Sequence, residues 1–228
     1  MAAQSSRLVL PPMAWKSLYV VARTLINMDD KQAATRHLDL GCGTVPRNPY
    51  GKSELFGVDI RPLSSLPDVV FKCADLCLEP IPFPGNYFGS VSAFDYLEHV
   101  PRLLVSADGK STFFPFVRLM SEVWRVLAPS GRFYALTPAY PSPTAFQDPT
   151  HVNIITQVTH EYFCGESPLG AMYGFNGRFR VLRAELVVHK DARTAGDLTP
   201  RQKLRRFKYR WQGRLTHLLW ELEAIKES

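Results

Sequence analysis

The stretch HLDLGCG at residues 37–43 combines a short apolar run with two glycines that lie one residue apart. Asp39 lies just ahead of the glycines, and Gly41 and Gly43 let the backbone turn tightly and approach a ligand closely. The next apolar run, residues 54–60, carries another carboxylate near its end, that of Asp59. At this place in an α/β sheet, a carboxylate can accept hydrogen bonds from ribose hydroxyls. The pattern predicts a nucleotide-like ligand at the ends of two neighbouring strands.

Similar apolar runs recur through the first 140 residues. Bounded by glycine, proline and aspartate, they indicate buried strands of a parallel sheet, which we expect at 36–41, 54–60, 69–73, 89–95 and 132–137. Residues 113–127 have apolar side chains at helical spacing, and a short helix is expected near 157–163. The predicted fold class is therefore α/β, with a Rossmann-like and mostly parallel sheet.

Two further expectations concern the edges of this fold. Prolines in the connections after the first two strands discourage helices, so the early helices should be trimmed or missing. Residues 174–182 and 184–189 are expected to form a final antiparallel hairpin. Strand and connection alternate without a dividing linker, which favours one domain.

We predict that this domain has three parts. Residues 1–35 form an N-terminal helical extension with helical spacing over 14–28, residues 36–190 form the Rossmann-like core, and residues 191–228 form a basic amphipathic helix. A capping box begins the last helix, with Thr199 as N-cap, Pro200 in the first turn and Gln202 three residues on. Its apolar stripe comprises Leu204, Phe207, Trp211, Leu215, Leu218, Leu219, Leu222 and Ile225.

The composition excludes several classes of protein. With 46% hydrophobic and 21% charged residues over 228 positions, the chain is not disordered, fibrous or a disulfide scaffold. The four cysteines form no C-x-x-C pair, and no apolar run approaches the length of a membrane span. We expect a soluble, cytoplasmic protein. The net charge of +6 permits anionic partners.

Two nucleotide-binding motifs compete for the glycine loop. A nicotinamide or flavin site needs a third glycine where this sequence has Pro46, and that glycine lets a helix pack onto the strand. Residues 46–53 lack the first glycine of a P-loop, and a strand follows where a P-loop has a helix. Both motifs are disfavoured.

Four motifs in order point to a third kind of site. They are Asp39-x-Gly-x-Gly43, Val58-Asp59, Ala74-Asp75-Leu76 and the segment FDYLEHV at 94–100. Residues 36–140 therefore resemble the class I S-adenosylmethionine-dependent methyltransferases, and within them the broad small-molecule group (type 11-like). The sequence departs from that pattern at Val45-Pro46, where many members have another glycine and a helix.

The resemblance implies that S-adenosyl-L-methionine is the cofactor and suggests how it is held. The glycine loop would line its methionine end, with Asp39 directed at the amino group. Asp59 would bind the ribose, and Ile60 would pack on the adenine. Asp75 would accept from the adenine amine, and Leu76 would contact the ring through its backbone. The full set of expected cofactor residues is Asp39, Gly41, Cys42, Gly43, Asp59, Ile60, Asp75, Leu76 and Phe94, whose carbonyl would meet the methionine ammonium.

The expected acceptor site lies just beyond the fifth strand. Residues 146–153 resemble a stretch of methyltransferases associated with bacterial surface polysaccharides, and substrates of open α/β sheets bind at this edge. We expect His151 to be the general base, oriented by Asp148, with His99 as a further candidate; both Asp148 and His151 could instead cap the turn. His160 and Glu161 are assigned to a helix face. Because these groups match no standard ligand spacing, no metal is expected.

These observations predict methyl transfer to a small-molecule or saccharide hydroxyl by in-line displacement. Alignment of the reacting atoms supplies most of the catalysis in such a reaction. The alternatives are a catalytically silent methyltransferase-like interaction protein and an RNA methyltransferase; the fourth strand lacks the Pro-Pro-aromatic run that enzymes acting on base amines carry, which disfavours nucleic acid. The basic helix is expected to contact the protein's own domain, a second copy, an anionic membrane surface, or a phosphate- or lipid-linked acceptor.

Overall fold

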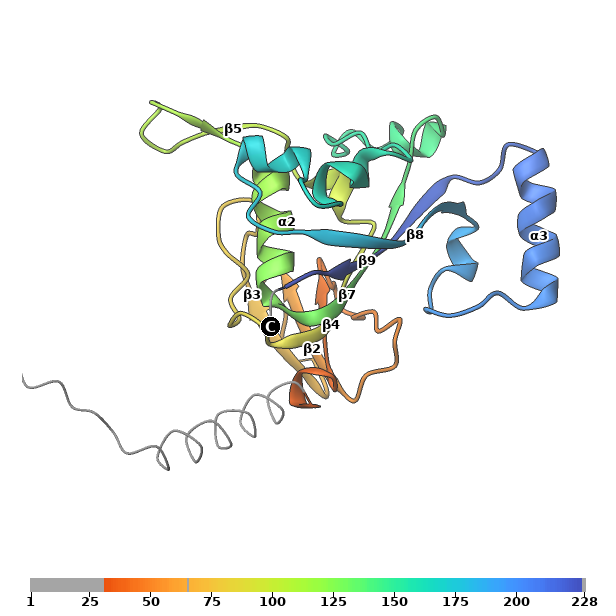
Figure 1. Cartoon of the computed structure of the whole chain (residues 1–228), viewed down its shortest axis with the longest axis horizontal. Helices are drawn as coiled ribbons and strands as arrows, with labels where there is room; N and C mark the ends of the chain where they lie inside the picture. Colours follow the sequence, from red (N-terminus) through yellow and green to blue (C-terminus); the bar gives the residue numbers. More distant parts are fainter. Residues whose placement is uncertain (1–30, 65, 227–228) are drawn as a thin grey trace, which may run out of the picture.

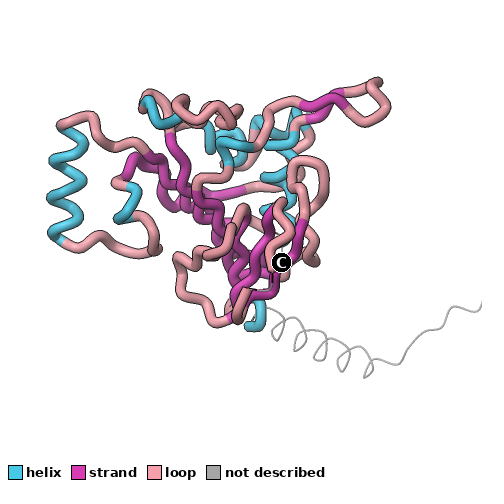
Figure 2. The backbone as a smooth tube through the Cα atoms, turned by 180° about the vertical axis from the view of Figure 1, so that it is seen from behind, coloured by secondary structure: helices cyan, strands magenta, loops and turns pink. Residues whose placement is uncertain are grey.

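A seven-stranded sheet forms the centre of the molecule. The computed structural model describes residues 31–64 and 66–226, and the predicted N-terminal helix at 14–28 lies outside them. The strands gather in the middle of the molecule (Figures 1 and 2). The strand order is β3-β2-β1-β4-β7-β9-β8, the first five strands are parallel, and β9 runs antiparallel to both neighbours. Their bounds are β1 Arg36–Leu40, β2 Glu54–Asp59, β3 Val69–Cys73, β4 Phe88–Phe94, β7 Leu127–Pro138, β8 Phe179–Val187 and β9 His217–Ala224.

Burial explains why the central strands read as continuous apolar runs. β1, β2 and β4 are buried along most of their length, whereas β3 at the sheet edge is mostly exposed. A parallel sheet covered on both faces has no polar side, so its strands do not alternate. The predicted α/β class and the mostly parallel, Rossmann-like sheet are confirmed.

Few helices cover this sheet. The helix expected at 113–127 is α2 Pro115–Val126, which lies beside the sheet (Figure 1). It buries Leu119, Met120 and Val123 in the core. Residues 41–53, 60–64, 66–68 and 74–87 contain no helix, which confirms the trimmed early helices. The remaining elements are 3-10 turns and a two-stranded hairpin: η1 Leu97–His99, β5 Leu104–Val105, β6 Thr112–Phe113, η2 Pro143–Ala145, η3 Thr159–Phe163, η4 Leu169–Tyr173 and η5 His189–Asp191.

The C-terminal helix is much shorter than predicted. α3 covers Pro200–Trp211, and Gly213, with φ +63°, adopts the left-handed conformation that commonly follows a helix end. The chain then enters the sheet as β9, so the expectation of one helix over 191–228 and of a core ending at residue 190 is wrong. Leu218, Leu219 and Leu222 belong to the buried strand. Their spacing fits a helix and a doubly buried strand equally well.

The C-terminal antiparallel hairpin exists, but with other members than expected. Residues 179–187 form one strand, β8, whose register shifts between Val181 and Arg183. Its partner is β9, and the connection between the two carries η5 and α3. Within the described residues the longest helices have 12 residues, and none combines the length and apolarity that a bilayer span needs.

Strand β9 carries two acidic residues into the sheet. Glu221 accepts hydrogen bonds from Arg183 Nε at 2.8 Å and from the Tyr50 hydroxyl at 2.9 Å. Glu223 accepts from Arg180 at 2.6 Å. Buried carboxylates need such partners, because an unpaired buried charge is strongly destabilising. The pairs on β8 therefore allow an acidic strand to occupy an interior position.

Replacement of a leucine on either side of Gly213 tests the assignment of residues 217–224 to a buried strand and of residues 200–211 to an exposed helix. Leu222 is fully buried, so Leu222→Ala should lower the free energy of unfolding by about 2–5 kcal/mol. The matched change Leu204→Ala, on the exposed side of α3, should alter it by less than about 0.5 kcal/mol. Urea unfolding followed by circular dichroism measures both; equal effects would contradict a buried β9.

Candidate active site

The glycine loop joins the ends of β1 and β2. Gly41 and Gly43 have φ of +64° and +56°, a region that favours glycine. A Cβ at Gly41 would lie 2.6 Å from Cδ2 of Tyr96, so this position also needs the smallest side chain. The Gly43 N–H donates to Asp59 Oδ2 at 2.9 Å. The two strand ends are thereby held together.

Asp39 lies buried beneath this loop. Its carboxylate accepts from the Arg47 N–H at 2.7 Å and from the Ser92 hydroxyl at 2.5 Å. Burial raises the pKa of Asp39 to about 7, against the lowering effect of these two hydrogen bonds. The network continues through His37, which lies 2.8 Å from the hydroxyls of both Ser90 and Ser92. Through these contacts Asp39 connects the loop after β1 to Ser92 on the neighbouring strand β4.

Asp59, at the end of β2, is engaged by Arg61. The Arg61 backbone N–H and Nε donate to Oδ1 at 2.9 and 3.0 Å. Burial raises the pKa of Asp59, but the hydrogen bonds from Arg61 and from Gly43 outweigh it, and the net pKa is below its usual value. The carboxylate is therefore held ionised, as an acceptor of hydroxyl hydrogen bonds should be.

A pocket of about 440 Å³ opens beside these residues. This volume is within the usual range for small-molecule sites, and the side chain of Ile60 is 63% exposed next to it. Five of the nine expected cofactor residues line the pocket. The complete lining is Gly41, Val58, Asp59, Ile60, Arg61, Ala74, Asp75, Leu76, Cys77, Tyr96, His99 and Val100.

The other expected cofactor residues lie outside that lining. Cys42 is buried, and its Sγ fills the space beside Gly57. Phe94 packs toward Tyr134, with ring centroids 5.9 Å apart. Sequence reasoning missed Tyr96, whose ring covers Gly41 and lines the pocket. Its position two residues after β4 was the available signal, because side chains that follow parallel strands gather at one edge.

The histidines predicted for catalysis form one cluster. His99 and His151 have ring centroids 4.8 Å apart, and His99 lines the pocket. The Thr150 hydroxyl lies 3.0 Å from His99 Nδ1 and donates to Asp148 Oδ1 at 2.7 Å. His151 Nε2 is 3.9 Å from Asp148 Oδ2. Asp148 thus lies close to both histidines.

Neither His160 nor Glu161 joins this cluster. His160 is buried on η3 against Trp220, with ring centroids 6.0 Å apart, and Glu161 is exposed beside it. Groups of three potential metal ligands occur at two places among residues 31–64 and 66–226, and both residues are absent from each. The assignment of the pair to a local turn of helix agrees with this arrangement.

Glu98 is a buried acid that the sequence did not single out. Its Oε2 accepts from the Thr137 hydroxyl at 2.8 Å, and its Oε1 has no hydrogen-bond partner among the described residues. Burial raises the pKa of Glu98 to about 7, and the charges of Asp95 and Asp148 add to this effect. A buried carboxyl with a raised pKa beside a pocket is typical of a functional site.

Comparison with known proteins identifies the fold. The chain is similar to a methyltransferase candidate in complex with the Trm112 methyltransferase activator of Haloferax volcanii, at 15% identity over 92% of this chain and 97% of that one, with a TM-score of 0.53. Other similar structures are S-adenosylmethionine-dependent methyltransferases from Mesorhizobium loti (16% identity, 82% and 90% covered, TM-score 0.48) and Archaeoglobus fulgidus (15%, 90% and 93%, 0.48). No protein-family model and no curated protein sequence matches the chain.

These likenesses concern the fold. The mostly parallel sheet with a reversed strand β9 is a Rossmann-like fold, which this chain shares with the methyltransferase candidate in the Trm112 complex. At this level of identity the likeness extends no further than the fold, because one fold serves many functions.

The raised pKa of Glu98 predicts a pH dependence of stability. Because its pKa rises from 4.5 to about 7 on folding, the folded state binds more protons than the unfolded state between these values. Stability should therefore fall as the pH rises from 4.5 to 7, by up to about 3 kcal/mol from this group. Urea unfolding at a series of pH values measures this dependence. Glu98→Gln should remove the fall in the free energy of unfolding that Glu98 causes, whereas the matched change at the exposed Glu166, Glu166→Gln, should keep it. The same pH dependence in the wild type and both variants would refute the raised pKa of Glu98.

Proposed function

We propose that the protein is an S-adenosylmethionine-dependent methyltransferase. The observation that carries the proposal is that residues of all four sequence motifs line one and the same pocket. The pocket offers the ionised carboxylate of Asp59 and the exposed side chain of Ile60 at the end of β2, and the carboxylate of Asp75 just after β3. These are the groups that a ribose, an adenine face and an adenine amine require.

The residues present fit this cofactor in distinct ways. Asp59 would accept from the ribose hydroxyls, Ile60 would pack against the adenine, and Asp75 would accept from its amine. Gly41 lets the Tyr96 ring approach the glycine loop closely, so Tyr96 and the loop would together line the methionine end. When bound, S-adenosylmethionine supplies an electrophilic methyl group on a sulfonium. The remaining task of the protein is to align an acceptor with it.

His99 and His151 are the proposed proton acceptors for an acceptor hydroxyl. His99 lines the pocket, and the ring of His151 contacts the ring of His99 edge to face. Asp148 supports this role by its position, since its Oδ2 lies 3.9 Å from His151 Nε2 and its Oδ1 accepts from the Thr150 hydroxyl that lies next to His99. We assign the general base to His151 because of the resemblance of residues 146–153. Because His99 lines the pocket and contacts His151, we propose that it passes the proton between the acceptor and His151.

A saccharide or small-molecule hydroxyl is the proposed acceptor. Tyr140 and Phe146 follow β7 at this edge, both more than half exposed, with ring centroids 6.4 Å apart and perpendicular planes. Exposed aromatic faces offer flat apolar surfaces to the C–H face of a sugar ring. The two rings therefore support the proposal that the acceptor carries a sugar ring.

Calorimetry with S-adenosylmethionine and S-adenosylhomocysteine tests the cofactor assignment. Both should bind, and Asp59→Ala should raise Kd roughly ten- to one-hundred-fold, because a hydrogen bond to a charged group contributes about 1.5–3 kcal/mol. The matched change Asp108→Ala, on the β5–β6 connection, should leave Kd unchanged. If neither compound binds the intact chain, the silent interaction protein becomes the better account.

If the two histidines act on the acceptor, their replacement should lower turnover and leave cofactor binding unchanged. Transfer of labelled methyl groups into a fractionated extract would provide the acceptor for this assay. His151→Ala should lower kcat by about 10²–10⁴-fold, as expected for a general base. Full turnover in His151→Ala would disprove the choice of base.

Helix α3 supports a second part of the proposal, contact with an anionic lipid surface. Leu204, Phe207 and Trp211 are 63–81% exposed and, at 3.6 residues per turn, lie within a sector of roughly 60°. The opposite face is docked to the body by ion pairs of Arg205 with Asp191 and of Arg206 with Glu185. These pairs fix the rotation of the helix, so the apolar stripe faces solvent.

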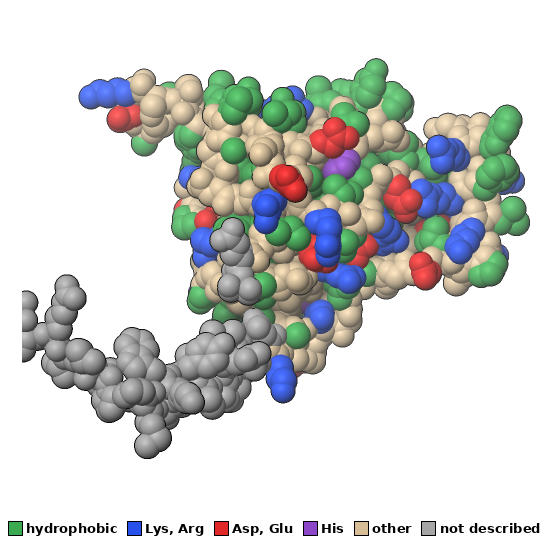
Figure 3. All heavy atoms as spheres, viewed as in Figure 1, with side chains coloured by type: hydrophobic (Ala, Val, Ile, Leu, Met, Phe, Trp, Pro, Cys, Tyr) green, Lys and Arg blue, Asp and Glu red, His purple; other side chains and the backbone are tan. Residues whose placement is uncertain are grey.

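Cations flank that stripe on both sides. Arg201 and Lys208 lie along one border and Lys203 and Arg210 along the other, and all four are exposed. Apolar and basic side chains gather on the α3 side of the molecule (Figure 3). An apolar stripe with Trp and Phe between two rows of cations is typical of helices that lie in a membrane interface. A lipid-linked acceptor would be presented from such a surface.

Vesicle sedimentation tests this contact. The chain should bind phosphatidylcholine vesicles that contain phosphatidylglycerol, bind pure phosphatidylcholine weakly, and release as salt rises. Trp211→Ser and Arg210→Glu should each weaken binding, whereas the matched surface changes Met172→Ser and Lys110→Glu should not. A stripe that instead mediates self-association would show concentration-dependent dimers and no vesicle binding.

A further inference from the structure

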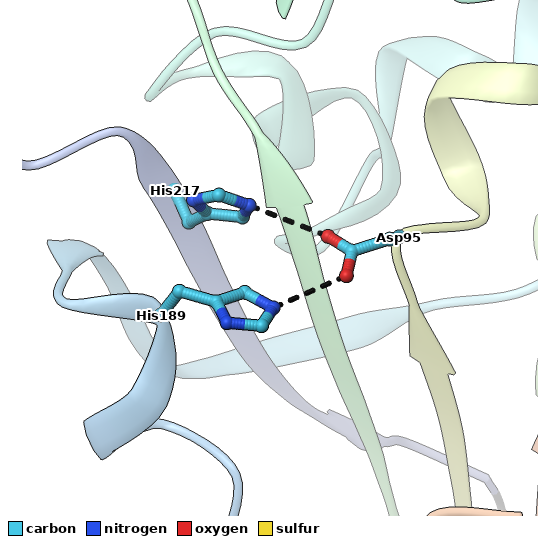
Figure 4. Close-up of side chains that lie close together, drawn as sticks. All are labelled: Asp95, His189 and His217. Atoms are coloured by element: carbon cyan, nitrogen blue, oxygen red, sulfur yellow. Dashed lines mark hydrogen bonds and ion pairs between the residues drawn. The ribbon is translucent and has the colours of Figure 1, made fainter. Parts of the chain in front are cut away.

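Three titratable side chains converge at the carboxyl edge of the sheet, outside the pocket lining. Asp95 directly follows β4, His189 belongs to η5, and His217 begins β9 (Figure 4). Asp95 has φ +48°, a left-handed conformation that Asp and Asn tolerate better than most residues. Its carboxylate is directed between the two imidazole rings. Residues far apart in the sequence thus meet around one carboxylate.

The distances in this cluster suit a metal ion. His189 Nε2 lies 3.1 Å from Asp95 Oδ2, and His217 Nε2 lies 3.4 Å from Oδ1. The ligand atoms of all three residues lie within 4.8 Å of one another. Metal–ligand bonds of about 2.0–2.2 Å place neighbouring donor atoms roughly 2.8–3.1 Å apart in octahedral geometry and roughly 3.3–3.6 Å apart in tetrahedral geometry. The side chains therefore need little rearrangement to coordinate an ion.

The surroundings of the cluster also resemble those of a metal centre. His217 Nδ1 lies 2.8 Å from the Thr216 hydroxyl, an oxygen that can accept its N–H and orient the ring. The side chains of Asp95 and His189 are 46% and 33% exposed, so one side of the cluster is open to solvent. Three protein ligands with an open side are the arrangement of catalytic rather than purely structural metal sites.

We propose that Asp95, His189 and His217 form a binding site for a divalent first-row transition ion such as Zn²⁺. Two imidazoles and one carboxylate are a ligand set that suits Zn²⁺, Co²⁺ and Fe²⁺ better than Mg²⁺ or Ca²⁺, which prefer oxygen. The ligands come from β4, η5 and β9. The ion would therefore link the β8–β9 connection to the parallel part of the sheet.

The place of the site suggests what its open side would bind. Asp95 is adjacent in sequence to Tyr96, which lines the pocket proposed for the cofactor. An oxygen of the acceptor is therefore the ligand we assign to the open positions. This role, unlike the binding of the ion itself, rests on the proposed methyltransferase function.

Metal titration of the full chain, freed of ions by a chelator, tests the site. Calorimetry with Zn²⁺ and visible absorption with Co²⁺ should both report one ion per chain. Asp95→Asn, His189→Ala and His217→Ala should each lower affinity by at least about tenfold, since even supporting residues around a metal contribute 10–100-fold. Asp95→Asn keeps the backbone conformation, and circular dichroism checks that every variant is folded.

The second histidine cluster supplies the matched control. Glu98, His99 and His151 form the other group of three potential metal ligands among the described residues. His99→Ala and His151→Ala each remove an imidazole from that group and should leave metal affinity unchanged. Absence of metal binding, unchanged affinity in Asp95→Asn and His189→Ala, or loss of binding only in the His99 and His151 variants would each overturn the proposal. Asp95→Asn should still bind S-adenosylmethionine, so failure of the metal site is distinguishable from failure of the cofactor assignment.

Discussion

The carboxylate of Asp59 links the parts of the molecule on which the site depends. Through the Gly43 N–H it holds the glycine loop of β1 against the end of β2, and through Arg61 it holds the chain that leaves β2. Both contacts favour the ionised form, and they lower the pKa of Asp59 against the raising effect of burial. The floor of the pocket is thus assembled by the same group that is proposed to bind the ribose.

Local sequence was sufficient for the parallel half of the fold. The strands around Asp39, Asp59 and Asp75, and the helix α2, were predictable because each is marked by an apolar run with glycine or proline at its ends. The pocket followed from the same motifs, since parallel strands bring their carboxyl ends to one edge. Five of the expected cofactor residues line it for this reason.

The antiparallel half could not be predicted in the same way. The run Leu218-Leu219-Trp220 continues the apolar spacing of α3, and only the short connection at 212–216, with Gly213 in the left-handed conformation, separates the helix from the strand. The group of Asp95, His189 and His217 depends on where β9 enters the sheet, which no local pattern encodes. Residues that meet through tertiary structure carry no spacing signal.

The place of β9 between β7 and β8 has a consequence for biosynthesis. On the ribosome, β8 emerges before β9 and has no sheet neighbour until residues 217–224 have followed it. During that interval β7 presents an unpaired edge to the cell, a surface that invites pairing with other chains. The chain should therefore be most prone to aggregation, and most dependent on chaperones, in the interval between the synthesis of β8 and that of β9.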